Sequence, residues 1–354
     1  MDAGSISAPA SGSFLDRQIH RTNRSLLLIS LFLIAAVVTY AVAERRYLYN
    51  FFAGPFEVSE TQLIAVQQPG LVSHYFVKAK GDETYETGIQ QIETETENGK
   101  VKSETVKAKY SVLRVAERLL VVKCEPKEDG VAYTGEIAEI PPDVRDHVIT
   151  PLLKEHPDAN RAFLPFMLDT TGFRDEGYVA LGFGIPAILL AGWLIVTVMR
   201  RSADPATHPV VKRAVVYGNL ADVAQQLDMD LQGPTVKIGG ATVTQSWVFY
   251  PTSFTLSLCR IPDLIWAYKK VTKHSVNLIP TGKTYEVIMY DRFGKPLQLR
   301  ARQSKIDAIL ALLAERAPWA VFGYSDDLKN SFSLNWPGFI AAVDQRRARS
   351  AGTK

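Results

Sequence analysis

The chain reads SLLLISLFLIAAVVTYAVA at Ser25–Ala43 and YVALGFGIPAILLAGWLIVTVM at Tyr178–Met199. These stretches of 19 and 22 residues contain no Asp, Glu, Lys or Arg. At a rise of about 1.5 Å per residue, a helix of either length reaches roughly 28 Å or more, which is enough to cross the hydrocarbon core of a bilayer. The sequence therefore predicts a membrane protein with two transmembrane helices.

The charge changes sign between the segments that these spans separate. Residues 44–177 carry 16 Lys and Arg against 23 Asp and Glu, a net charge of −7, whereas residues 200–354 carry 21 against 12, a net charge of +9. Two separate domains are therefore expected. The predicted organisation is an N-terminal tail 1–24, spans at 25–43 and 178–199, an acidic domain 44–177, a connector 200–214, a basic domain 215–335 and a C-terminal helix with a basic end 336–354.

Basic residues beside the spans predict the orientation. They are Arg17, Arg21, Arg24, Arg200, Arg201, Lys212 and Arg213. Short flanks rich in Lys and Arg stay in the cytoplasm. Arg45 and Arg46, directly after the first span, oppose this orientation, but two spans require both termini on one side. We expect a two-pass protein of the inner (plasma) membrane with both termini in the cytoplasm and residues 44–177 outside it.

A cleaved signal peptide is the alternative for the first segment, because Ala41 and Ala43 form an A-x-A pattern before Glu44. Its apolar stretch is longer than the 7–15 residues usual for a signal peptide, and Tyr40 lies in its last turn. We therefore expect an uncleaved span.

The acidic domain reads mostly as β-strands. Asn98-Gly99 and Asp129-Gly130 are typical of hairpin turns between alternating polar and apolar residues. A helix is expected from Pro141-Pro142, with Val144 and Val148 on one face, ending at Pro157. We expect about five strands in a small barrel, of the OB type, packed with one helix.

Two cysteines, Cys124 and Cys259, fall in different domains. If the spans are placed correctly, the two thiols face different compartments and cannot pair with each other. We expect neither domain to depend on an intramolecular disulfide, and both cysteines to act as small buried hydrophobic residues.

The basic domain reads as a run of strands closed by an amphipathic helix after Gln303, with Ile306, Ile309, Leu310 and Leu313 on its apolar face. With Trp247–Tyr250 and the Ile261–Tyr268 strand, this layout resembles the pleckstrin-homology-like superfold. The whole chain resembles bacterial two-span membrane proteins that carry such a domain in the cytosol. The resemblance implies an α+β fold over about residues 215–325 and a binding or scaffolding role.

Motifs for chemistry are weak. Gly282-Lys283-Thr284 matches the end of a phosphate-binding loop, but Asn277 stands where its first glycine is needed. Asp143 and His147 could form half a metal site, and Glu93, Glu95 and Glu97 could hold a cation; a solvated helix face and a solvated hairpin face are the simpler explanations. We expect no catalytic residue, no cofactor, no metal and no nucleic-acid partner.

A cluster of lysines is the candidate binding site. Lys269, Lys270, Lys273 and His274 lie close together, and Lys283, Arg300 and Arg302 could join them from a neighbouring strand. Near an inner leaflet, each exposed Lys or Arg adds on the order of 1 kcal/mol of attraction to anionic lipid heads. Because neighbours on a strand point to opposite faces, Lys269 and Lys273 are expected to share a side and Lys270 to lie on the other.

Three classes of function fit this sequence. The favoured one is a non-enzymatic membrane protein that binds or senses outside the cytoplasm and relays or scaffolds inside it, with the bilayer and unidentified proteins as partners. The alternatives are a structural subunit of a larger membrane complex and a membrane enzyme whose site is assembled from distant residues.

Overall fold

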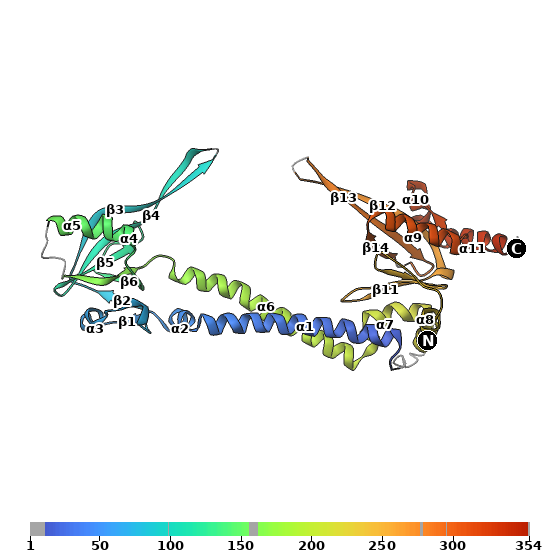
Figure 1. The fold of residues 1–354 in the computed structure, drawn as a ribbon, viewed down its shortest axis with the longest axis horizontal. Helices are drawn as coiled ribbons and strands as arrows, with labels where there is room; N and C mark the ends of the chain where they lie inside the picture. The colour runs from blue at the N-terminus through green and yellow to red at the C-terminus, as the bar shows by residue number, and fades with distance from the viewer. Residues whose placement is uncertain (1–10, 98, 156–161, 277–278, 295, 353–354) are drawn as a thin grey trace. The chain divides into compact units, whose positions relative to one another are not determined.

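The computed structural model describes residues 11–97, 99–155, 162–276, 279–294 and 296–352 (Figure 1). The chain divides into two compact units. One is Leu33–Leu189, here named the middle unit; the other, the tail unit, joins the chain up to Phe32 to the chain from Leu190 onwards. Asn98 and Pro157, expected in a hairpin turn and at a helix end, lie outside the described residues.

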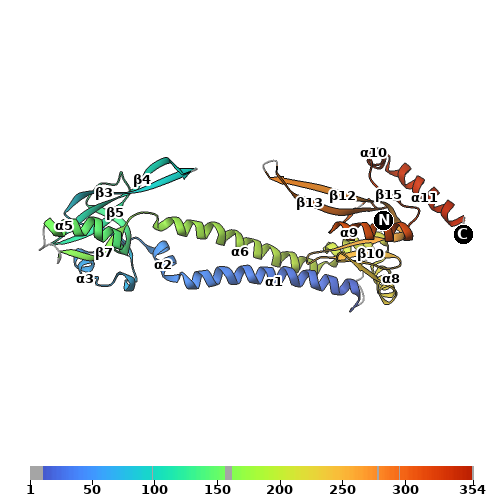
Figure 2. The same cartoon turned by 45° about the horizontal axis from the view of Figure 1, so that its top comes forward.

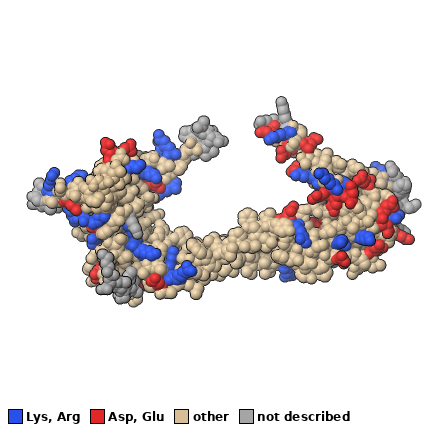
Figure 3. Space-filling view, turned by 180° about the vertical axis from the view of Figure 1, so that it is seen from behind, with Lys and Arg blue, Asp and Glu red and all other residues tan. Residues whose placement is uncertain are grey.

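Two long helices run from one unit into the other. They are α1 (Phe14–Ala43, 30 residues) and α6 (Phe173–Ala203, 31 residues). The most apolar 18-residue window of each helix is 11% buried, whereas the core helix of a soluble protein is mostly buried. Figure 3 shows their surface with few charged side chains. Two helices long and apolar enough to cross a membrane are thus present, and both extend beyond the predicted spans.

The middle unit contains one seven-stranded sheet. In spatial order its strands are β1 (Phe56–Glu57), β2 (Phe76–Lys80), β6 (Ala132–Glu139), β7 (Phe163–Asp169), β5 (Arg118–Cys124), β4 (Lys100–Val115) and β3 (Glu83–Glu97). The β1–β2 and β5–β7 pairs are parallel and the other pairs are antiparallel. The expected hairpin of β3 and β4 is confirmed.

The barrel expected for this unit is not found among the described strands. β1 and β3 are the edges of the sheet and do not pair with each other, so the sheet is open. The difference arises at β7, which lies between β5 and β6. This strand contains Pro165, a residue that argues against a central strand in sequence.

Helices cover both faces of this sheet. On one face, Leu63 of α3 (Glu60–Ala65) packs with Val77, Leu120 and Phe166. On the other face, Val144, Val148 and Ile149 pack against Val121 and Met167. These three residues belong to a continuous helical segment built from α4 (Pro142–Val144), a π-helical turn (Arg145–Ile149) and α5 (Thr150–Glu155). The helix predicted from Pro141-Pro142 is confirmed.

The tail unit contains two four-stranded sheets. One has the order β11 (Leu256–Arg260), β10 (Trp247–Pro251), β9 (Ala241–Val243), β8 (Val236–Ile238); the other has the order β14 (Pro296–Ala301), β13 (Ile279–Asp291), β12 (Leu264–Val276), β15 (Val321–Phe322). Helix α9 (Gln303–Arg316) packs Ile306, Ile309 and Leu313 into the core shared by these sheets. The predicted apolar stripe of this helix is confirmed at those three positions. Short helices α7 (Pro209–Ala214), α8 (Leu220–Gln232), α10 (Asp326–Leu334) and α11 (Trp336–Gly352) complete the unit.

The first turn of α1 is part of the tail core. Phe14 and Leu15 pack with Trp247, Phe249 and the α8 residue Leu227. The ring centroids of Phe14 and Phe249 are 4.8 Å apart, and the backbone N–H of Phe14 donates to an Asp228 carboxylate oxygen at 2.9 Å. Within the predicted N-terminal tail of residues 1–24, the part from Phe14 onwards is therefore helical and packed against the tail unit.

Two hairpins extend beyond their sheets. β4 pairs with β5 from Lys109 to Val115, so the rest of β4 has β3 as its neighbour (Figure 2). Likewise, β13 pairs with β14 from Tyr285 to Tyr290, and the distal part of the β12–β13 hairpin lies beyond that pairing. Each hairpin therefore presents free strand edges.

Candidate functional site

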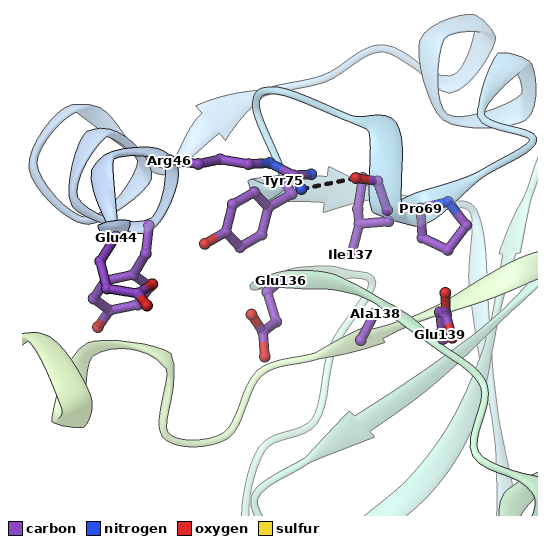
Figure 4. Close-up of a pocket in the computed structure, with 10 residues that line it drawn as sticks. Glu44, Arg46, Pro69, Tyr75, Glu136, Ile137, Ala138 and Glu139 are labelled. Atoms are coloured by element: carbon purple, nitrogen blue, oxygen red, sulfur yellow. Dashed lines mark hydrogen bonds between the residues drawn. The ribbon is translucent and has the colours of Figure 1, made fainter. Parts of the chain in front are cut away.

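A pocket of about 340 Å³ lies in the middle unit, directly after α1. Three segments line it: Glu44, Arg46 and Tyr47 around the start of α2 (Arg45–Ala53); Pro69, Gly70 and Tyr75 before β2; and Glu136, Ile137, Ala138 and Glu139 of β6. Figure 4 shows Arg46 and Tyr75 on one wall and the β6 residues on the other. Its volume lies within the range of small-molecule sites.

Hydrogen bonds from α2 hold the first wall in place. The buried amide of Asn50 donates to the Ser73 carbonyl at 2.8 Å and accepts from the N–H groups of Tyr75 and Phe76 at 2.8 and 3.1 Å. Arg46 donates to the carbonyl of Gly70 at 2.7 Å and to that of Val72. Its guanidinium also lies 4.8 Å from the centre of the Tyr75 ring. The loop before β2 is thereby fixed on α2.

A second set of contacts ties this wall to α6. The Tyr47 hydroxyl donates to the Phe173 carbonyl at 2.7 Å, at the first residue of α6. The Phe173 ring stacks on Phe76, with centroids 4.1 Å apart. The pocket therefore stands where the two long helices enter the middle unit.

The pocket carries more acidic than basic groups. Glu44, Glu136 and Glu139 face a single guanidinium, that of Arg46. Within the described ranges, no cation or hydrogen-bond donor pairs with the Glu136 carboxylate; Lys123 is 2.9 Å from Asp169 instead. Partial burial, and then the nearby charges of Asp169 and Glu176, raise the pKa of Glu136.

Tyr75 supplies a neutral phenol. Figure 4 shows its ring pointing into the pocket, on the side of Glu44 and Glu136. Burial, followed by the Glu136 charge, raises the pKa of Tyr75 to about 12, so the hydroxyl stays protonated at neutral pH. The lining thus offers carboxylates, phenols and one guanidinium, which are groups for charge recognition and hydrogen bonding.

A smaller, more apolar pocket of about 220 Å³ shares Ile137 with the first. Val58, Leu63, Val66 and Val72 contribute most of its apolar lining. His74 lies at this pocket and stacks on Phe56, with ring centroids 4.2 Å apart.

The predicted lysine cluster is only partly free for an anion. Lys269 lies 2.8 Å from Asp307 of α9, and Lys270 lies 3.7 Å from Glu286 of β13. Lys273 has no acidic partner in the part of the chain that is described, and it stands directly opposite Lys283 in the β12–β13 hairpin. Like charges facing each other across strands repel, which favours a bound anion at this pair. Lipid contact at Lys269, Lys270 and Lys273 stays a prediction.

The remaining candidates have structural partners. The His147 ring contacts the Asp143 carbonyl rather than its carboxylate, and Glu93 and Glu97 pair with Lys107 and Lys102. Among the described residues, no group of three or more His, Cys, Asp or Glu side chains is arranged to hold a metal. Cys124 and Cys259 are free and buried, as expected.

No local sequence pattern indicates this pocket, because its walls come from segments about 90 residues apart. Arg46 had counted only as evidence against the predicted orientation. The available signal was the run of aromatic and basic residues Arg45–Phe52, directly after an apolar span. Such a run is typical of a membrane–water boundary.

Residues 223–332 are similar to a family described as a domain of unknown function, DUF6709. The matched segment begins in α8 and ends in α10, so it lies within the tail unit and covers less than a third of the chain. No curated protein and no solved structure shows significant similarity to the chain.

Proposed function

We propose that this protein crosses the inner (plasma) membrane twice, with both termini in the cytoplasm and the middle unit outside. The exposed apolar surfaces of α1 and α6 and the basic flanks support this topology. The contact of Phe14 and Leu15 with the tail core supports it too, because it requires both ends of the chain on one side.

The function proposed for it is non-enzymatic binding outside the membrane, coupled to a cytoplasmic binding or scaffolding domain. One observation carries this proposal: the two ends of α1 are built into two different sites. Glu44 and Arg46, directly after α1, line the pocket, whereas Phe14 and Leu15, in its first turn, fill the tail core.

A continuous helix can couple such sites because it transmits displacement along its axis. A ligand shifts a conformational equilibrium by the difference between its affinities for the two states. A ligand that repositions the wall around Arg46 therefore acts on the start of α2, which follows α1 almost directly.

For the tail unit we propose a pleckstrin-homology-like fold and contact with anionic lipid heads. The two four-stranded sheets closed by α9, antiparallel except for the β12–β15 pair, support the fold. The net charge of +9 over residues 200–354 supports the lipid contact, as does Lys273, which has no acidic partner among the described residues and faces Lys283.

Cysteine labelling in intact cells tests the topology. Glu104→Cys on β4 and Lys329→Cys on α10 place thiols at exposed positions of the two units. The native Cys124 and Cys259 give a low background, since both are buried and burial raises both thiol pKa values. An impermeant maleimide should label the Glu104→Cys protein only, and both proteins after lysis. Labelling of the Lys329→Cys protein in intact cells would overturn the orientation.

Hydrogen exchange tests the coupling. Arg46→Ala removes the contacts to Gly70, Val72 and the Tyr75 ring, and should speed exchange in the tail strand β10. Lys78→Ala, which removes an exposed cation from β2 of the same unit, is the matched control. Unchanged β10 exchange in the Arg46→Ala protein would refute the coupling and leave the topology standing.

A further inference from the structure

The pocket beside α2 holds a carboxylate, that of Glu136, with which no described group forms an ion pair or hydrogen bond. Glu136 is half-buried and has no described partner, while its neighbours Asp169 and Glu176 add negative potential. The charge of Lys123 lowers the pKa of Glu136 in part, but the Lys123 ammonium itself lies 2.9 Å from Asp169. A partly buried carboxylate is stabilised more by a bound cation than an exposed carboxylate is, because less water screens the interaction.

The cation in the wall does not fill this role. The donors of Arg46 are directed at the carbonyls of Gly70 and Val72, and its guanidinium lies over the Tyr75 ring. Arg46 therefore supports the wall and does not pair with the Glu136 carboxylate.

The size of the pocket favours an organic cation over a bare metal ion. A water molecule takes about 30 Å³ in the liquid, so a pocket of about 340 Å³ has room for a molecule of several non-hydrogen atoms. The described chain also has no cluster of three or more ligands that suits a metal ion. An organic cation fits both observations, and a bare metal ion fits neither.

We propose that this pocket binds an organic ammonium group, with its nitrogen held by the carboxylates of Glu136 and Glu44 and by the phenol oxygen of Tyr75. This inference rests on the proposed binding function and names the chemical class of the ligand. Ammonium donates three hydrogen bonds, and carboxylate and phenol oxygens accept them. Two sources share this chemistry: a soluble amine, and the ethanolamine head of a lipid.

Titration calorimetry on the full chain in detergent tests the proposal. The probes are ethanolamine and its uncharged analogue ethylene glycol. Ethanolamine should bind and ethylene glycol should not. Glu136→Gln, which keeps the shape of the side chain, should weaken ethanolamine binding by about tenfold or more, as expected for loss of one partly buried charge-assisted hydrogen bond.

Matched variants separate loss of the site from loss of the fold. Glu104→Gln removes the same charge from the exposed β4 hairpin and should leave ethanolamine affinity unchanged. Tyr75→Phe keeps the ring over which Arg46 lies and should cost about fivefold, as for a neutral hydrogen bond. Equal affinity in the Glu136→Gln and native proteins, or no ethanolamine binding at all, would overturn the ammonium site.

Native mass spectrometry from nanodiscs distinguishes the two sources. In nanodiscs of phosphatidylethanolamine and phosphatidylglycerol, retention of the ethanolamine lipid by the native protein and its loss in the Glu136→Gln protein would identify a lipid head. Ethanolamine binding without retained lipid would identify a soluble amine. Preferential retention of phosphatidylglycerol through this pocket would refute the proposal. Cysteine labelling reports the topology whatever the ligand, so a failed ammonium site and a failed topology give different results.

Discussion

Nε2 of His208 lies 3.0 Å from Oγ1 of Thr22, joining two residues that are 186 positions apart in the chain. Thr22 donates its hydroxyl hydrogen to the Ile19 carbonyl at 2.9 Å, so its oxygen accepts from Nε2–H. Nδ1 of the same ring accepts from the Val210 N–H at 3.2 Å and caps α7. A neutral imidazole with its hydrogen on Nε2 satisfies both contacts, and it fastens α1 to the connector after α6.

Removing this imidazole should destabilise the tail unit. His208→Ala deletes a helix cap and a buried hydrogen bond, so the free energy of unfolding should fall by about 2 kcal/mol. His208→Asn should lose less, because asparagine also caps helices. Thermal unfolding in detergent, with Thr22→Val and the double variant, measures the coupling. Additive effects of the two single changes would show that the His208–Thr22 contact contributes nothing.

The same residue should make stability fall in acid. Burial, with the Arg201 charge as a second cause, lowers the pKa of His208 from 6.5 to about 4. Between these pH values the unfolded chain binds a proton that the folded chain does not, so the free energy of unfolding decreases as pH falls from 6.5 towards 4. Above pH 6.5 the contribution of His208 to the free energy of unfolding keeps its full value. The His208→Asn protein should lose less stability between pH 7 and pH 5 than the native protein. Parallel pH curves for the two proteins would contradict this assignment.

A tail unit expressed without the first turn of α1 should lack part of its hydrophobic core. Leu15 is fully buried in the tail core, so Leu15→Ala should cost about 2–5 kcal/mol in the full chain. A fragment of residues 205–354 lacks both Phe14 and Leu15. A peptide of residues 11–24 added to that fragment should raise its melting temperature in proportion to peptide occupancy. The same peptide with Ala at positions 14 and 15 is the control, and equal stabilisation by both peptides would refute the docking.

Amine binding at the pocket should weaken in acid. The ammonium group requires an ionised Glu136, whose pKa is raised by burial and by Asp169 and Glu176. Affinity for ethanolamine should therefore fall as pH drops through that raised pKa, while the amine itself stays protonated. Calorimetry between pH 5 and pH 7.5 measures this slope. The residual binding of the Glu136→Gln protein should vary less with pH, and an equal slope would assign the titration to another group.

The lysines of the tail should contribute unequally to vesicle binding. Changing Lys273 and Lys283 to Gln should reduce binding of the peptide-supplemented 205–354 fragment to phosphatidylglycerol vesicles, because these two charges face each other and repel. Changing Lys269 and Lys270 should matter less, since both pair with acidic side chains. Co-sedimentation across a salt series measures both effects, and binding should fall as salt screens the charges. Salt-insensitive binding would contradict an electrostatic contact.

Local patterns predicted the features that depend on neighbouring residues. The apolar spans, the hairpin of β3 and β4, the helix after Pro141-Pro142 and the stripe of Ile306, Ile309 and Leu313 each follow from periodicity or turn chemistry within a short window. Burial of Cys124 and Cys259 follows from residue type alone.

Features made by distant contacts could not be predicted in this way. Gln18 and Thr22 are polar yet buried, because α1 continues into the tail unit, and no hydropathy window indicates that. Lys269 looked free because Asp307 lies 38 residues away. The pocket depends on the position of β6 beside β2, which sets Glu136 near Tyr75 through sheet order rather than sequence spacing.

The docking of Phe14 also bears on how the chain is made. Its hydrogen-bond partner Asp228 is synthesised 214 residues later, after the residues of both long helices. The first turn of α1 can therefore pack only after the tail has been made. A molecule threaded with its N-terminus on the opposite side would leave the space beside Trp247 and Phe249 empty. In the proposed topology, completion of the tail core thus requires both ends of the chain on the same side of the membrane.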